Sequence, residues 1–199
     1  MFGLQAVKLK AAREFTEEDG LTRMAGDEWL IQGPVTYFPR IEVAVEKVME
    51  AAIIEHSQAL RLRAKAETKD SKGVGRCAGE EWLVRDTGAY MPSIDEEIVE
   101  TVQSIVLTEK RALHLVALNT FTDVYGVQRR AGEQWLVTNE MADAHLCDVY
   151  EQVMGEVPLT TLSSRQFAVV VDPFIDGIQK FGVLELRQGE VCICLAVIV

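Results

Sequence analysis

The chain has 199 residues, 48% of them hydrophobic, which is enough to bury a core in one domain or in several small modules. Its formal net charge of −11 at pH 7 argues against a nucleic-acid surface, because phosphate binding needs a clustered excess of lysine and arginine. The first residues lack a secretory signal pattern and no run approaches the roughly 20 apolar residues of a membrane span, so we expect a soluble cytoplasmic protein that does not contact a membrane.

One motif recurs at a fixed step along the chain. The segment AGDEWLI around Trp29 returns as AGEEWLV around Trp82 and as AGEQWLV around Trp135, each time 53 residues further on. A fixed period of this length is typical of repeat architectures. It predicts three repeats and a partial, divergent fourth one, with the boundaries 1–54, 55–107, 108–162 and 163–199.

The elements of the first repeat favour strands. Apolar residues alternate with lysines over 6–11, which is the period of a half-buried strand, and 59–64 and 112–117 match this segment. The acidic stretch that ends at Gly20 suits a hairpin loop with a left-handed glycine, and Gly73 and Gly126 fall in the same column. A short strand around the tryptophan comes next, then a turn around Gly33–Pro34 or Gly88, and then a Tyr-x-Pro at which strand pairing is limited.

The last segment of a repeat is ambiguous from its residues alone. The stretch 41–54 contains Glu, Ala and Met, and the stretch 93–107 contains three Glu, all of which favour an amphipathic helix, but both also contain recurrent β-branched residues. We predict strands there, and with them an all-β chain built as a tandem array of small antiparallel β-sheet repeats of about 53 residues. Helices in these two stretches are the alternative.

Nine residues of the recurring motif are predicted to anchor the repeats structurally. A repeat of this size has little core of its own, so one large aromatic side chain that buries roughly 150–250 Å² can hold it together. The preceding glycine permits a turn or a close backbone approach. The predicted anchors are Gly26, Trp29, Leu30, Gly79, Trp82, Leu83, Gly132, Trp135 and Leu136.

The fourth copy departs from the pattern. It begins at 166–171, but Gly189-Glu190 is followed by Val191 rather than by a Trp-Leu pair. The nine apolar residues from Val191 to Val199 have the composition of a buried or edge strand, and an uncovered strand of this kind is prone to aggregate.

No residue pattern indicates an enzyme, a cofactor or a metal site. The cysteines Cys77, Cys147, Cys192 and Cys194 form no CxxC pair, so we expect reduced thiols and no zinc. The three histidines fall in variable columns, where His145-Leu146-Cys147 replaces the Tyr-x-Pro after a two-residue insertion. The acidic glycine loops lack calcium ligands, because the first position of an EF-hand-type loop would be Phe15, Thr68 or Phe121.

Charged residues also recur in columns. The basic positions Lys8, Lys10, Arg61 and Arg63, with the acidic positions Glu28, Glu80, Glu81 and Glu133, are predicted to pair laterally between neighbouring chains. Exposed ion pairs contribute only ~0–1 kcal/mol each, so they would set the register of the chains more than their affinity.

These motifs resemble the repeats of the major vault protein family. The resemblance is carried by the AG-x-E-W-L columns, the strand 59–64, the Gly88-Ala89-Tyr90 turn with Pro92, and the segment 106–110, and it covers about residues 6–173. It implies strings of antiparallel β repeats that stand side by side as the wall of a hollow ribonucleoprotein particle. It also implies a vault-associated poly(ADP-ribose) polymerase as a partner, and a minor nuclear fraction beside the cytoplasmic one.

Two functional hypotheses follow. The first is a non-enzymatic wall segment of a vault-like particle, whose partners are copies of itself or of full-length vault protein. The alternative is a free-standing β-repeat adaptor that recruits a protein partner without building a shell. The shoulder domain and cap helix of the family have no counterpart in these 199 residues, so we expect this chain alone to be a rod-like monomer or a small oligomer.

Overall fold

The computed structural model of the chain describes all residues except 1–4, 18–19, 176–177, 189–190, 194–196 and 199. Every regular element in the described part is a β-strand, and neighbouring strands in its sheets run antiparallel. The predicted all-β fold with small antiparallel sheets is therefore confirmed. No helix long and apolar enough to cross a membrane occurs in the described residues.

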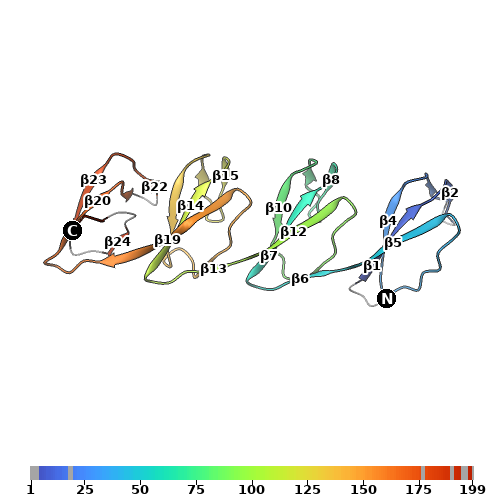
Figure 1. The fold of residues 1–199 in the computed structure, drawn as a ribbon, viewed down its shortest axis with the longest axis horizontal. Helices are drawn as coiled ribbons and strands as arrows, with labels where there is room; N and C mark the ends of the chain where they lie inside the picture. Colours follow the sequence, from blue (N-terminus) through green and yellow to red (C-terminus); the bar gives the residue numbers. More distant parts are fainter. Residues whose placement is uncertain (1–4, 18–19, 176–177, 189–190, 194–196, 199) are drawn as a thin grey trace. The chain divides into compact units, whose positions relative to one another are not determined.

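The chain divides into two compact units, Met1–Thr101 and Val102–Val199. We call one antiparallel sheet built around a central strand, together with its short hairpin, a module. The first module of the first unit is a three-stranded sheet with β1 in its centre (Figure 1). Leu9 of β1 lies opposite Trp29 of β4, and a register shift between Lys8 and Leu9 marks a bulge against β5. The strands are β1 (Gln5–Ala11), β4 (Glu28–Gln32) and β5 (Val43–Glu50), with the hairpin β2 (Phe15–Thr16) and β3 (Thr22–Arg23).

The second module repeats this sheet around β7 and adds a strand pair. That pair joins β6, from the end of the first predicted repeat, to β11, where Gly88 lies in a strand rather than in the predicted turn. The strands are β6 (Ala52–Ile54), β7 (Gln58–Ala64), β10 (Glu81–Val84), β11 (Gly88–Tyr90) and β12 (Glu96–Gln103), with the hairpin β8 (Thr68–Lys69) and β9 (Gly75–Arg76).

The second unit begins with the third module, whose central strand is β14 (Figure 1). Here too a strand from the end of the preceding repeat, β13, pairs with one after the tryptophan strand, β18. The strands are β13 (Ile105–Val106), β14 (Arg111–Ala117), β17 (Gln134–Val137), β18 (Ala144–His145) and β19 (Glu151–Thr161), with the hairpin β15 (Phe121–Thr122) and β16 (Gln128–Arg129).

The remaining strands of the second unit form a further sheet and extend the third module. Strand β20 pairs with β23 and β25, while β22 pairs with β17 and β24 pairs with β19. They are β20 (Phe167–Val171), β21 (Phe174–Ile175), β22 (Ile178–Gln179), β23 (Leu184–Gln188), β24 (Val191–Ile193) and β25 (Val197–Ile198). The predictions for Gly189-Glu190 and Cys194 lie outside the described residues, as do those for the side chains of the 191–199 tail.

The stretches that composition left open between helix and strand are strands β5 and β12. In β5 only Val43 is buried and in β12 only Glu96, and most of the following residues are exposed. A strand is favoured there because β1 and β7 are each flanked by one short strand, β4 or β10, and the backbone groups on their other side need partners. Backbone pairing thus outweighs the intrinsic helix preference of Glu, Ala and Met.

The hairpin loops confirm the left-handed glycines. Gly20, Gly73 and Gly126 have φ angles of 88°, 80° and 81°. Each donates its amide to the carbonyl of the residue three positions earlier, at 2.9–3.0 Å. A side chain would be strained at these angles, which explains why glycine recurs in this column.

Candidate functional site

The three tryptophans occupy matching positions in their sheets. Trp29, Trp82 and Trp135 lie opposite Leu9, Leu62 and Leu115 of the central strands. Trp82 is 5% exposed and Trp135 is 0% exposed, whereas Trp29 is only half-buried, so the three predicted anchors are not equally buried.

The difference in burial follows from the neighbouring strand pairs. Ile54 packs in the core with Trp82, and Leu107 packs in the core with Trp135, and both residues come from the end of the preceding repeat. Among the described residues no such strand pair accompanies the first module, and Trp29 borders an open cavity of about 360 Å³. The preceding repeat therefore completes the core around the tryptophan.

An arginine covers each tryptophan, which sequence analysis missed. The guanidinium carbons of Arg23, Arg76 and Arg129 lie 4.7, 5.0 and 4.7 Å from the indole centroids. A guanidinium over an indole face is attracted by the negative face of the ring. The signal was present in the sequence, because each arginine stands six residues before its tryptophan.

A carboxylate holds each of these arginines in place. The side-chain distances are 3.0 Å for Glu17–Arg23, 2.9 Å for Asp70–Arg76 and 2.8 Å for Asp123–Arg129. The last pair is the most buried, with side chains 0% and 5% exposed. Burial acts to raise the pKa of Asp70, but hydrogen bonds from the Val74 amide, from Arg76 and from the Lys72 amide outweigh it and lower that pKa. This cluster of carboxylate, arginine and tryptophan stabilises each module from within.

The other predicted anchors have more varied surroundings. Leu136 is buried with Ala112 and Val157, while Leu30 and Leu83 are half-buried. The glycines share one role, because each donates its amide at 2.8 Å to the last alanine of the central strand, in the pairs Gly26–Ala11, Gly79–Ala64 and Gly132–Ala117. The anchoring role of these residues stays a prediction.

The charged columns pair within the sheets, and their pairing between neighbouring chains stays a prediction. Lys8 lies 2.6 Å from Glu28 and 2.8 Å from Glu46, all in the first module. The hydrogen bond of Glu28, and then that of Glu46, raises the pKa of Lys8. Cross-strand neighbours on one sheet face are close enough to satisfy each other.

The acidic positions of the second and third modules are also paired within their own modules. Glu81 binds Arg63 at 2.6 Å and Arg61 at 2.7 Å, and these hydrogen bonds lower the pKa of Glu81. Glu80 and Glu133 bind the arginines of their own tryptophan clusters, Arg76 and Arg129. The charges therefore stabilise the modules themselves.

The strands β5 and β12 are edge strands of the first and second modules. In the described residues each has one hydrogen-bonded neighbour, β1 or β7. They expose apolar side chains to solvent, namely Val45, Val48, Ile98 and Val99, which are 36–54% exposed. An edge strand with exposed apolar residues is able to pair with another chain.

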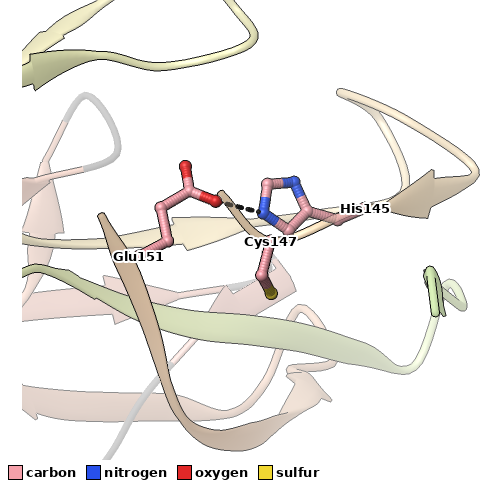
Figure 2. Close-up of side chains that lie close together, drawn as sticks. All are labelled: His145, Cys147 and Glu151. Atoms are coloured by element: carbon pink, nitrogen blue, oxygen red, sulfur yellow. Dashed lines mark hydrogen bonds and ion pairs between the residues drawn. The ribbon is translucent and has the colours of Figure 1, made fainter. Parts of the chain in front are cut away.

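A buried cluster of titratable side chains lies in the third module. His145 Nε2 is 3.0 Å from Glu151 Oε2, and both side chains are 0% exposed (Figure 2). The Tyr125 hydroxyl lies 3.0 Å from His145 Nδ1, and the two rings stack with their centroids 5.8 Å apart. Burial, and then the charge of Glu151, raises the pKa of Tyr125 to about 12. Cys147 completes the cluster, and donor atoms of His145, Cys147 and Glu151 all lie within 4.8 Å of one another.

The second module contains the same arrangement with a different first residue. The Tyr90 hydroxyl donates to Glu96 Oε2 at 2.8 Å, and the Ser93 amide donates to the same oxygen at 2.8 Å. In the third module the Asp148 amide donates to Glu151 Oε2 at 2.8 Å. His145 thus stands where Tyr90 stands, as the aligned columns predict, but the carboxylate partner was not foreseen.

Cys77, His56 and His114 lie apart from this cluster. Cys77 and His56 are exposed, and His114 is buried with its Nε2 2.8 Å from Gln134 Oε1. In the described part of the chain, the cluster at His145 is the one group of three His, Cys, Asp or Glu side chains close enough to hold a metal ion.

The sequence is similar to proteins that share this repeat. The family model of the Major Vault Protein repeat domain matches residues 4–40, 52–93 and 105–148. The second and third matches begin where β6 and β13 begin.

Full-length relatives match nearly the whole chain. The chain is 53% identical over 194 residues to major vault protein alpha of Dictyostelium discoideum, covering 96% of the chain and 23% of the relative. It is 52% identical to the major vault protein of Gallus gallus and 48% identical to that of Homo sapiens, each over 186 residues and 93% of the chain. It spans 22% of the former and 21% of the latter, so it corresponds to about a fifth of these relatives.

Proposed function

The chain belongs to the family of major vault protein repeats, and from this membership we propose that it is a structural wall segment of a vault-like ribonucleoprotein particle. Its partners in this role are copies of itself or of full-length vault protein, standing side by side. The relatives' name supports the proposal, since they are called major vault proteins. The role is non-enzymatic, and its proposed location is the cytoplasm with a minor nuclear fraction.

The observation that carries the proposal is the contrast between the inside and the edge of the modules. Most recurring charges and all three tryptophans are engaged within their own sheets. The edge strands β5 and β12 instead leave one backbone side unpaired among the described residues and expose apolar side chains. Edge strands that recur from module to module can each make a small contact with a neighbouring copy. The binding energies of these contacts add up along the chain.

Co-assembly with a full-length relative tests the proposal. The tagged 199-residue chain is expressed with full-length major vault protein, and the purified particles are imaged by negative stain. We expect the tag in hollow particles, while the chain alone stays a monomer or a small oligomer, because an interface well below ~1,000 Å² per module is weak. Tagged chain that is always excluded from such particles and forms a stable complex with one other protein would favour the adaptor alternative.

Substitutions on the edge strands locate the contact. Val45→Glu in β5 and Val99→Glu in β12 place a charge on an exposed edge, so we expect each to reduce incorporation into particles. Val74→Glu is the matched control, because Val74 is 49% exposed in a hairpin loop and Val45 is 48% exposed. Equal incorporation of all three variants would contradict contact through these strands. The same particles test the proposed docking of a vault-associated poly(ADP-ribose) polymerase, by its co-purification.

A further inference from the structure

The cluster in the third module differs from its counterpart in the second module at two neighbouring positions. Where the second module has Tyr90 and Pro92, the third has His145 and Cys147, and the carboxylate is present in both modules as Glu96 and Glu151. Tyrosine and proline are poor ligands for a divalent cation, whereas imidazole and thiolate are good ones. Both changes therefore bring metal-binding donors to a carboxylate that the second module uses only for hydrogen bonds.

Against the expectation from the cysteine spacing, we propose that His145, Cys147 and Glu151 form a binding site for a zinc-like divalent cation. One imidazole, one thiolate and one carboxylate are the ligand types that zinc prefers, while calcium and magnesium prefer oxygen ligands alone. Three protein ligands leave a fourth position for a water molecule.

The distances suit this chemistry. Donors in a tetrahedral zinc site are about 3.5 Å apart, given bonds of about 2.0 Å to nitrogen and 2.3 Å to sulfur. His145 Nε2 and Glu151 Oε2 are already 3.0 Å apart, and no pair of donor atoms in the cluster exceeds 4.8 Å. The largest separation therefore exceeds that of a tetrahedral site by only about 1.3 Å.

Two features of the surroundings favour a cation at this place. Glu151 Oε1 is buried and has no hydrogen-bond partner among the described residues, so this oxygen is available to coordinate a cation. The Tyr125 hydroxyl lies 3.0 Å from the other ring nitrogen, Nδ1, and its oxygen can accept a hydrogen bond from Nδ1–H when Nε2 binds the cation. Cys147 is only partly buried and offers a route of entry, and its thiol releases a proton to solvent on binding.

A cobalt titration tests the site. The starting protein is the full chain with Cys77→Ser, Cys192→Ser and Cys194→Ser, which leaves Cys147 as the single thiol. Added Co²⁺ alone is expected to give a thiolate-to-cobalt charge-transfer band that saturates at one equivalent, and Zn²⁺ is expected to abolish it by displacement. Absence of the band, or a band that never saturates, would overturn the proposal.

Variants that imitate the second module separate binding from folding. His145→Tyr restores the tyrosine and carboxylate pair seen at Tyr90, and Cys147→Ser removes the thiolate with little change of size, so both are expected to fold and to lose saturable binding. Tyr125→Phe removes the outer partner of the imidazole and is expected to weaken binding about 10-fold. His56→Gln, at an exposed histidine, is the matched control and is expected to bind normally. Unchanged cobalt binding in folded His145→Tyr protein would refute the site.

Discussion

The buried pair of Asp123 and Arg129 offers a sharp test of how the modules are stabilised. Asp123 accepts hydrogen bonds from the amides of Tyr125 and Val127 and from Arg129 Nε, at 2.8–2.9 Å. The change Asp123→Asn keeps the size of the side chain and removes its charge. Breaking a buried ion pair typically costs about 3–5 kcal/mol. Because Glu133 stays 3.0 Å from Arg129 and keeps part of the charge compensated, we expect a loss of about 3 kcal/mol.

The matched control is Glu17→Gln in the first module. Glu17 and Arg23 form the equivalent pair, but their side chains are 26% and 23% exposed, so water screens the lost charge. For this variant we expect a loss of at most about 1 kcal/mol.

Hydrogen–deuterium exchange measures both effects in the module concerned. A loss of about 3 kcal/mol corresponds to roughly 100-fold faster exchange of the amides in β14 and β17 when exchange occurs through opening of the third module. The amides of β1 and β4 should change far less in the Glu17→Gln protein. If the two substitutions accelerate exchange equally in their own modules, burial does not decide the strength of these pairs.

Three further outcomes follow from the same structure. Trp135→Ala should cost about 3–5 kcal/mol and Trp29→Ala about half as much, because Trp135 is fully buried and Trp29 is not, and urea unfolding followed by circular dichroism compares them. The pKa of Asp70 in the folded protein is below its usual 3.8, so the Asp70 carboxylate stabilises the fold above pH 3.8, and this stabilisation is lost as the pH falls below 3.8. The urea midpoint of the Asp70→Asn protein should lack this acid dependence. Burial, and then the charge of Glu151, raises the pKa of Cys147 from its usual 9.0 to about 11, so stability should fall as the pH rises from about 9 towards 11, and Cys147→Ser should remove that part of the fall.

Both the tryptophan and the arginine of each cluster could be predicted from the sequence, but only the tryptophans were identified. The 53-residue step identified Trp29, Trp82 and Trp135 as equivalent positions. The same step relates Arg23 to Arg76 and Arg129, and that column, six residues before each tryptophan, was overlooked. The unequal burial of the tryptophans was not predictable, because it depends on strands β6 and β13 that pair beyond their own repeat.

The charged columns show a limit of a different kind. Alternation identified Lys8 and Lys10 as residues on the polar side of a strand, but it does not say whether their partners are in the same chain or in another. Pairing of β1 with β4 and β5 brings Glu28 and Glu46 to within 2.6–2.8 Å of Lys8. The register between neighbouring strands determines these ion pairs within the chain, and that register cannot be read from one strand alone.

By itself, the sequence determined the repeat step, the strand character of the central segments and the tryptophan columns, because all three are periodic patterns of single residues. The sequence favoured strands over helices in 41–54 and 93–107, and β5 and β12 confirm them. The tertiary structure alone decided that β6 and β13 pair with the following repeat, and that Glu151 meets His145. Each of these depends on which backbone groups are left to pair and on a turn that brings residues from separate strands together. Such contacts are properties of the folded backbone and leave no periodic trace along the chain.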